Sequence, residues 1–332
     1  MGVAFSKLSH ENDSLYKAIG GVMTEVISDL EKENGKHDEV LKAMFSMRKS
    51  KKFGERVGGV TTFSRFKPMA EGGVFEKDSL EEGFGKLAVH KAFGGGFTVT
   101  HEMAEDGEID AAKQATQGFM ESYKRGKLEF GTKYLTAEGE NFTYAGEMFD
   151  RTTGDGEGFF SDKHKIKKSA TTFGNVFTNK LGDDDVMLNK LANIGRNFKN
   201  DSGHSTGWTF DKIIIPSNTP DLERKLKAII ASTQVVGSNL NDVNIQKGKW
   251  DLVVNHLWEA EVGAEPFILM SSEAQRSFGA LRWYDREDLD IRNYIDESTR
   301  NLEWTGYCRY SILPVAWQGF IMAGAKKGIT LS

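Results

Sequence analysis

Residues 53–94 constrain the fold more than any other part of the chain. They hold two segments with strand character, 57–66 and 85–92, joined by a stretch rich in turn-forming residues. This pattern predicts a long two-stranded ribbon with a loop at its tip. An isolated two-stranded ribbon is only marginally stable in water. We therefore expect the ribbon to lie against the body of this chain or against a neighbouring chain.

Helical spacing of apolar residues predicts two long helices. One covers 14–33, and the other covers 109–135. The second contains Gly118, Gly126 and Gly131, and each glycine inside a helix costs up to about 1 kcal/mol relative to alanine. A helix that keeps three glycines is expected to bend or to pack closely against a neighbour. The basic stretch 46–52 is interpreted as a flexible joint.

The second half of the chain is typical of an α/β unit. After a loop-rich stretch over 136–182, helices are expected over 185–198 and from Pro220 onward. Buried-type strands alternate with them, and the chain ends in apolar strand segments. The expected strands cover 207–216, 250–256 and 266–270, which would form a mixed sheet, with a strand pair over 307–323.

Composition excludes several classes of protein. With 332 residues, of which 39% are hydrophobic, the chain can bury a sizeable core. Its 36 glycines against 5 prolines show no collagen period and favour bends over stiff linkers. A net charge of -5 disfavours a dedicated nucleic-acid binder. The single cysteine, Cys308, excludes an internal disulfide and favours a reducing compartment. Neither a signal peptide nor a membrane span is expected.

The chemical motifs of the sequence are incomplete. His101-Glu102 lacks the second histidine of a zinc-protease helix, and the run 94–96 precedes a strand rather than a phosphate-binding helix. The stretch 150–162 lacks the residue order of a calcium loop. His164 and His204 have no companion ligand nearby in sequence. We therefore assign no catalytic, cofactor-binding or metal-binding residues.

Four segments together suggest a family. They are Phe97-Thr-Val-Thr-His-Glu102, Gly156-Glu-Gly-Phe-Phe-Ser-Asp-Lys-His164, Lys212-Ile-Ile-Ile-Pro-Ser217 and Trp250-Asp-Leu-Val-Val254. In this order, behind an arm and a long hairpin, they resemble the major capsid proteins of tailed bacteriophages, which share the Hong Kong 97-type fold. The resemblance covers roughly residues 53 to 323.

The resemblance implies an α+β fold whose domains follow one another along the chain as they do in these capsid proteins. These are an N-terminal arm (1–52), an extended β-hairpin loop (53–94), a peripheral domain with a spine helix at about 107–135 (95–200), an axial domain (201–304) and a return to the peripheral domain (305–332). Glycine hinges are expected at Gly58, Gly59, Gly94, Gly95 and Gly96. The tip that contacts a neighbouring subunit would hold Pro68, Gly72 and Gly73.

The same resemblance implies a structural function without enzymatic activity or a cofactor. Pentamers and hexamers would assemble in the host bacterial cytoplasm into the icosahedral or prolate head of a phage or prophage, and the protein would then reside in the virion. The implied partners are copies of the chain, a scaffolding protein, a portal, a decoration protein and non-specifically contacted double-stranded DNA. Two alternatives remain: an encapsulin-type compartment shell, and a cytosolic α/β enzyme or ligand-binding protein using His164, His204 and the Asp155 loop.

Overall fold

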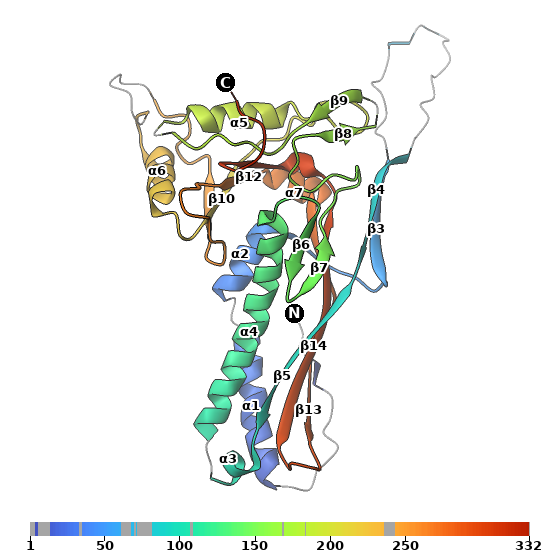
Figure 1. The fold of residues 1–332 in the computed structure, drawn as a ribbon, viewed down its shortest axis with the longest axis vertical. Coiled ribbons are helices and arrows are strands. Elements are labelled where there is room, and N and C mark those ends of the chain that lie inside the picture. The colour runs from blue at the N-terminus through green and yellow to red at the C-terminus, as the bar shows by residue number, and fades with distance from the viewer. Residues whose placement is uncertain are drawn as a thin grey trace. The chain divides into compact units, whose positions relative to one another are not determined.

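The fold is described from a computed structural model, whose contacts divide the chain into two compact units (Figure 1). The residues described are 4–5, 14–32, 35–60, 68–69, 71, 82–106, 109–167, 169–182, 184–235 and 243–331. The first unit comprises Met1–Glu55, Ala88–Gly131 and Trp283–Ile312. The second comprises Arg56–Leu87, Thr132–Arg282 and Leu313–Ser332. The predicted peripheral and axial boundaries near residues 200 and 304 stay predictions.

The first unit is built on a five-stranded sheet. Its strand order is β1 (Ala4–Phe5), β13 (Leu281–Ile295), β14 (Leu302–Pro314) and β5 (Lys91–Val99), and β2 (Ser46–Lys49) also pairs with β13. Strand β1 runs parallel to β13, and β5 runs antiparallel to β14. The helices of this part are α1 (Ser14–Lys32), α2 (Lys36–Met44), α3 (His101–Glu105) and α4 (Ile109–Thr136), the last of which continues into the second unit.

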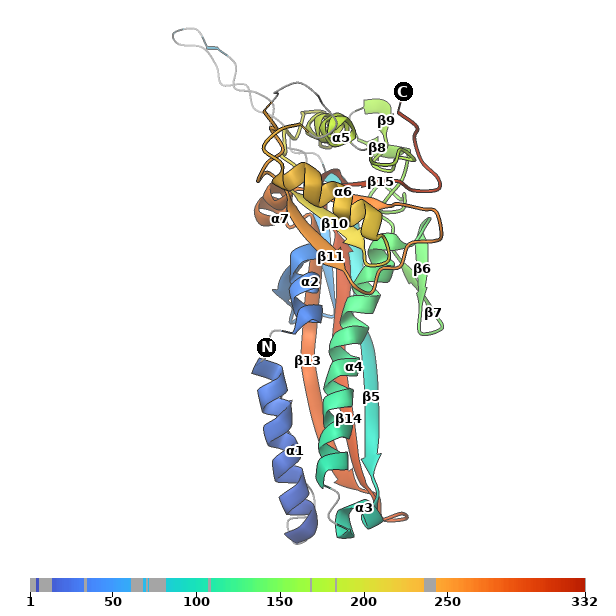
Figure 2. The same ribbon diagram turned by 90° about the vertical axis from the view of Figure 1, so that its left-hand side faces the viewer.

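Helices α1 and α4 cover one face of this sheet (Figure 2). The buried side chains between them are Met23, Ile27, Val99, Ala112, Met120, Leu289, Ile291, Leu302 and Trp304. The two helices predicted from apolar spacing are thereby confirmed. Cys308 lies buried in β14, where burial raises the pKa of its thiol to about 12. It therefore packs as a small apolar residue.

One sequence expectation for this unit was wrong. The stretch 46–52 is not simply a flexible joint, because β2 pairs with β13 and the Lys49 ammonium lies 2.6 Å from Asp288 Oδ2. The densely charged stretch after residue 283, on which the sequence analysis made no prediction, forms most of β13. Asp288, Asp290 and Arg292 alternate with the buried Leu289 and Ile291, so these three charged side chains lie on the opposite face.

The glycines of α4 differ in their surroundings. A Cβ on Gly131 would lie 2.8 Å from a ring carbon of Phe45 and 3.1 Å from Leu41, whereas a Cβ on Gly118 would meet nothing within 4 Å. The close packing expected of a glycine-rich helix is therefore present at Gly131 and absent at Gly118.

This contrast predicts opposite effects of alanine in one helix. Gly131→Ala should lower the free energy of unfolding by about 1–3 kcal/mol, because it overpacks a filled core. Gly118→Ala should raise it by up to about 1 kcal/mol through helix propensity alone. Urea unfolding of both variants measures the difference. Equal effects at the two positions would contradict the packing described for α4.

His90 lies buried between β4 (Glu82–Val89) and β5, with both ring nitrogens engaged. One nitrogen lies 3.1 Å from Ser50 Oγ and the other 2.9 Å from Ser311 Oγ. Burial lowers the pKa of the ring, and two nearby arginines act in the same direction while Glu55 opposes them. The folded protein therefore favours neutral His90.

Acidification should consequently destabilise the fold through His90. Below about pH 6.5, the ordinary pKa of histidine, the unfolded chain binds this proton more readily than the folded chain does. The free energy of unfolding should therefore fall as the pH drops from 7 to 5. His90→Gln should remove that part of the pH dependence, which unfolding curves at the two pH values measure. An unchanged dependence in the variant would show that His90 does not cause it.

The second unit contains a four-stranded mixed sheet, as the sequence predicted. Its order is β11 (Asp251–Asn255), β10 (Lys212–Pro216), β12 (Phe267–Met270) and β15 (Phe320–Ala323), with β10 parallel to β11 and antiparallel to β12. Around it lie α5 (Val186–Arg196), α6 (Pro220–Ala231), α7 (Ser272–Phe278) and the short helix η1 (Trp317–Gly319). No helix among the described residues is long and apolar enough to cross a membrane.

The expected pairing of strands over 307–323 was wrong. Strand β14 belongs to the first sheet, and β15 pairs with β12 in the second. The predicted loop-rich stretch 136–182 contains two hairpins, β6 (Asn141–Tyr144) with β7 (Glu147–Asp150) and β8 (His164–Ile166) with β9 (Ser169–Phe173). Ala145 and Gly146 both have positive φ at the first turn, a hairpin geometry that favours Asn-Gly and is hard to recognise without it.

Candidate functional site

The hairpin of β3 (Gly54–Val60) and β4 confirms the predicted ribbon. Within the second unit, β4 is attached through side chains distant in sequence. The ammonium of Lys86 donates to Asp150 Oδ2 and Thr152 Oγ1, and the backbone N–H of Phe84 donates to Asp201 Oδ2 at 3.2 Å. These contacts orient the base of the hairpin.

One face of β4 is exposed and apolar. Side chains alternate along the strand, so that Phe84, Lys86 and Ala88 are half-buried while Leu87 and Val89 are 54% and 40% exposed. An exposed apolar stripe on a narrow ribbon is unfavourable in water and is typical of a surface that contacts another chain. The hairpin is therefore attached to its own unit by one face of β4 and leaves the other face available.

Two carboxyl groups at the base of the hairpin have pKa values that are shifted from their usual range. Burial raises the pKa of Asp201, and the nearby Asp155 carboxylate adds to the shift. Burial alone would raise the pKa of Asp150, but its hydrogen bonds with Lys86 and Thr152 hold it below its usual range. Asp150 is therefore the charged partner of Lys86 at neutral pH.

The predicted loop-tip and hinge residues lie in different settings. Gly72 and Gly73 lie outside the described residues, while Pro68 is exposed. Gly58 and Gly59 are part of β3, and a Cβ on Gly58 would meet nothing within 4 Å. A role for these residues as a contact tip or a hinge stays a prediction.

The run Gly94, Gly95 and Gly96 was expected to precede a strand, but it lies within one. These glycines lie inside β5, opposite Tyr307, Gly306 and Thr305 of β14. A Cβ on Gly96 would lie 2.7 Å from the Trp304 carbonyl oxygen. The glycines therefore permit close packing of β5 against its neighbour, and a hinge movement at this place stays a prediction.

Asp155 and His164, named as possible parts of an enzyme site, are brought together. His164 Nδ1 lies 2.8 Å from Asp155 Oδ2, and its fully buried ring stacks on Trp317 with centroids 4.2 Å apart. Asp155 also accepts hydrogen bonds from the Thr153 hydroxyl and the Lys165 backbone N–H. Burial opposes ionisation of Asp155, but the hydrogen bond with His164 first, and those with Thr153 and Lys165 after it, hold its pKa below the usual range. This contact therefore joins the two ends of the loop between Asp155 and His164.

His204 does not complete this pair. Its backbone N–H bonds to the side-chain oxygen of Asn200 within a local turn. Within the described ranges, no group of three or more histidine, cysteine, aspartate or glutamate residues is arranged to hold a metal ion.

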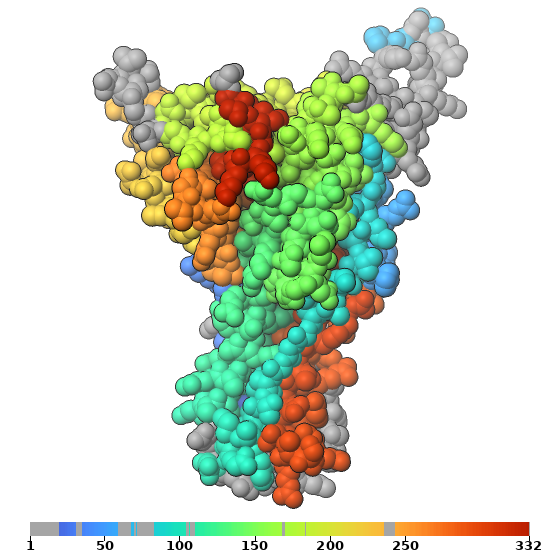
Figure 3. Space-filling view, viewed as in Figure 1, coloured from blue at the N-terminus to red at the C-terminus, as the bar shows by residue number. Residues whose placement is uncertain are grey.

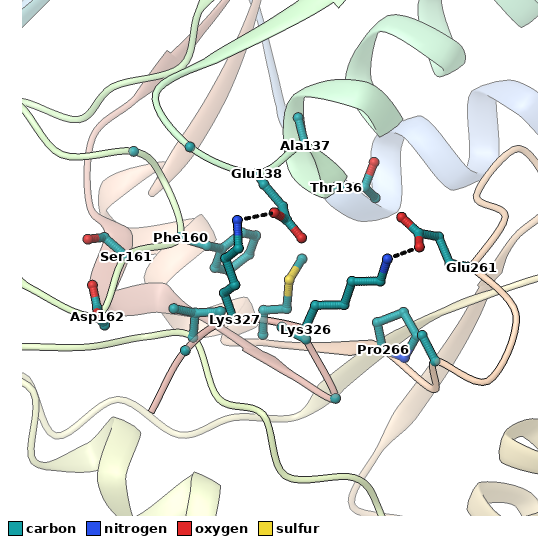
Figure 4. Close-up of a pocket in the computed structure, with 18 of the residues that line it drawn as sticks. Thr136, Ala137, Glu138, Phe160, Ser161, Asp162, Glu261, Pro266, Lys326 and Lys327 are labelled. Atoms are coloured by element: carbon teal, nitrogen blue, oxygen red, sulfur yellow. Dashed lines mark hydrogen bonds and ion pairs between the residues drawn. The ribbon is translucent and has the colours of Figure 1, made fainter. Parts of the chain in front are cut away.

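A second feature of this unit is a cavity of about 800 Å³ near the C-terminal end of α4 (Figure 4). It is lined by segments near residues 136–140, 157–163, 258–266 and 322–328, and by Val176. Lysines of the C-terminal segment lie across it, and Lys327 pairs with Glu138 while Lys326 pairs with Glu261. Figure 3 shows this C-terminal segment, in dark red, on the surface of the second unit.

Comparisons with known proteins identify the fold. The capsid of an empty GTA particle matches with a TM-score of 0.53 and 10% identity, over 88% of this chain and 90% of that chain. The capsid of a native GTA particle gives 0.52 and 8% over the same shares. A structure of Mycobacterium phage Patience gives 0.52 and 9%, over 97% of this chain and 92% of that chain. The chain has the Hong Kong 97-type capsid fold.

This capsid fold confirms the α+β class and the resemblance drawn from the ordered sequence segments. No family model and no curated protein matches the chain. Sequence reasoning found the hairpin but missed Lys86, Asp150 and Asp201, which hold its base in the capsid fold. Lys86 and Asp150 are 64 positions apart in the chain, and no local pattern signals such a pair.

Proposed function

We propose that the chain is the major capsid protein of a tailed phage or prophage. Copies would form pentamers and hexamers of an icosahedral or prolate shell around double-stranded DNA, assembled in the bacterial cytoplasm and found in the virion. The observation that carries this proposal is the capsid fold combined with a hairpin that leaves an apolar face of β4 exposed. Burying such faces between many copies would sum weak contacts into a stable shell.

The parts of the chain take the following roles in this proposal. Residues 53–94 form the extended loop over a neighbouring subunit, residues 95–200 and 305–332 the peripheral domain, and residues 201–304 the axial domain. A scaffolding protein, a portal and a decoration protein are further partners, and the packaged DNA is contacted without sequence specificity. The function is mechanical and requires no catalytic residues.

Sedimentation of the full-length chain tests the proposal, alone and co-expressed with the scaffolding protein of the same genome. Leu87→Glu with Val89→Glu should reduce the assembled fraction at least about tenfold, because charges would replace the apolar stripe at each contact. Met148→Glu is the matched control, since Met148 is 73% exposed on β7. Normal assembly of the β4 variant, or equal loss in the control, would show that the stripe is not an assembly contact.

A further inference from the structure

We propose that the cavity of the second unit, near the end of α4, is a docking site for a basic amphipathic helix of a partner protein. The proposal rests on the shape and charge of this cavity and not on shell formation. All of its lining residues belong to the second unit.

The floor of the cavity is apolar. Four of its lining side chains are large and buried: Phe160, Val176, Trp258 and Met322. Ala264 and Pro266 extend this floor, and Val262, between two lining segments, is fully exposed. A floor of this kind favours the apolar side chains of a ligand, and Val262 adds apolar surface beside it.

The rim of the cavity is acidic. Its carboxylates are Glu138, Glu140, Glu157, Asp162, Glu259 and Glu261, and its lysines are Lys163, Lys326 and Lys327. Glu138 and Glu261 are paired with the two tail lysines, and Glu157 with Lys165. The carboxylates of Glu140, Asp162 and Glu259 have no ion-pair partner among the described residues. This excess of negative charge complements lysine and arginine side chains.

Two exposed ammonium groups of this chain already pair with carboxylates at the cavity, as we propose for the partner. Lys326 and Lys327 extend over the floor, and their ammonium groups meet carboxylates from two different segments (Figure 4). A helix with an apolar stripe flanked by lysines would repeat this arrangement, with its stripe on the floor and its ammonium groups at the unpaired carboxylates. A volume of about 800 Å³ is within the range of ligand cavities and has room for several side chains from one helix face.

The walls are formed by close backbone contacts. A Cβ on Gly158 would lie 2.3 Å from the Gly139 carbonyl oxygen, and a Cβ on Gly324 would lie 2.2 Å from that of Glu265. Gly324 also has a φ of +69°, which disfavours other residues. Walls that are packed in this way need little reordering when a ligand binds, which favours affinity.

Binding of a model peptide to the full-length chain tests the proposal. The probe is a fluorescein-labelled peptide of about 14 residues, with leucine and alanine on one helical face and lysines beside them. Fluorescence anisotropy should show saturable binding of one peptide per chain that weakens as salt is added. A peptide with glutamate in place of every lysine should not bind.

Two double variants with equal charge changes locate the site. Glu140→Lys with Glu259→Lys should weaken binding by about tenfold or more, because two attractive contacts become repulsive. Asp221→Lys with Asp251→Lys is the control on exposed side chains outside the cavity, and it should change affinity by less than about threefold. A photo-crosslinking peptide should label residues 258–266 or 322–328.

Several results would overturn the proposal. They are the absence of saturable binding, equal weakening by both double variants, binding of the acidic peptide, and peptide crosslinks only outside the cavity. Crosslinks from the cavity of one copy to another copy, in a chain labelled at Val262, would assign the surface to self-association instead. These readouts do not require a shell, so they separate a failure of this inference from a failure of the capsid proposal.

Discussion

Asp285→Ala should lower the free energy of unfolding by about 3–5 kcal/mol, because it leaves a buried ammonium group without its counter-ion. Lys127 is 2% exposed, and its ammonium lies 2.7 Å from Asp285 Oδ1. The Trp283 indole N–H donates to the same oxygen at 2.9 Å. Three rings surround the ammonium with centroids 5.4–5.7 Å away, those of Tyr123, Trp283 and Tyr310.

The neutral double variant Lys127→Met with Asp285→Leu should recover most of this loss, since it removes both charges and keeps the volume. The control is Asp288→Ala, which breaks the surface pair with Lys49, a side chain that is 69% exposed, and should cost no more than about 1 kcal/mol. Urea unfolding measures all three variants. Similar losses for Asp285→Ala and Asp288→Ala would contradict the buried pair.

Arg151→Leu should be destabilising to a similar degree. The guanidinium is wholly buried and binds the end of α4 and the turn after it: Nε donates to the Tyr134 carbonyl oxygen at 2.9 Å, and Nη1 donates to those of Ala137 and Gly139. Burial lowers the pKa of this guanidinium to about 10, which leaves it charged at neutral pH. The leucine variant removes the donor of the buried Tyr134 carbonyl and of two partly buried carbonyls, and it should lose about 3 kcal/mol or more.

Arg151→Lys separates charge from geometry at this position. A lysine keeps the charge but cannot reach the carbonyls with the same fork of donors, so we expect a loss of at least about 1 kcal/mol. Arg224→Leu on α6, where the side chain is 75% exposed, should change stability by less than about 0.5 kcal/mol. Hydrogen exchange at the last turn of α4 should rise in the leucine variant. Unchanged exchange there would contradict the capping role.

Local signals in the sequence predicted much of the fold. Pro220 at the start of a periodic segment is typical of a first helical turn, and α6 begins there. The apolar run Ile213–Ile215 has the composition of a strand buried on both faces, and β10 has that position. The long helices followed from apolar spacing alone. In each case the deciding information lay within one element.

The features that the sequence analysis missed are those that a single segment does not reveal by itself. In β13, Leu289 and Ile291 alternate with Asp288 and Asp290, a period-two pattern that the high density of charge obscured. The short strand β2 is defined by its partner strand rather than by its own side chains.

The candidate sites could not be predicted from the sequence for the same reason, because their residues lie in separate segments of the chain. Asp155 and His164 were both noted, but only the folded chain shows that they bind each other. The cavity needs five separate parts of the chain, which no sequence pattern assembles.

Electron microscopy of negatively stained particles tests the central claim most directly. The full-length chain, expressed alone and with its scaffolding protein, should form closed shells of uniform size with five-fold and six-fold clusters of subunits. A chain that stays monomeric at high concentration under both conditions would contradict the capsid function, whatever its fold.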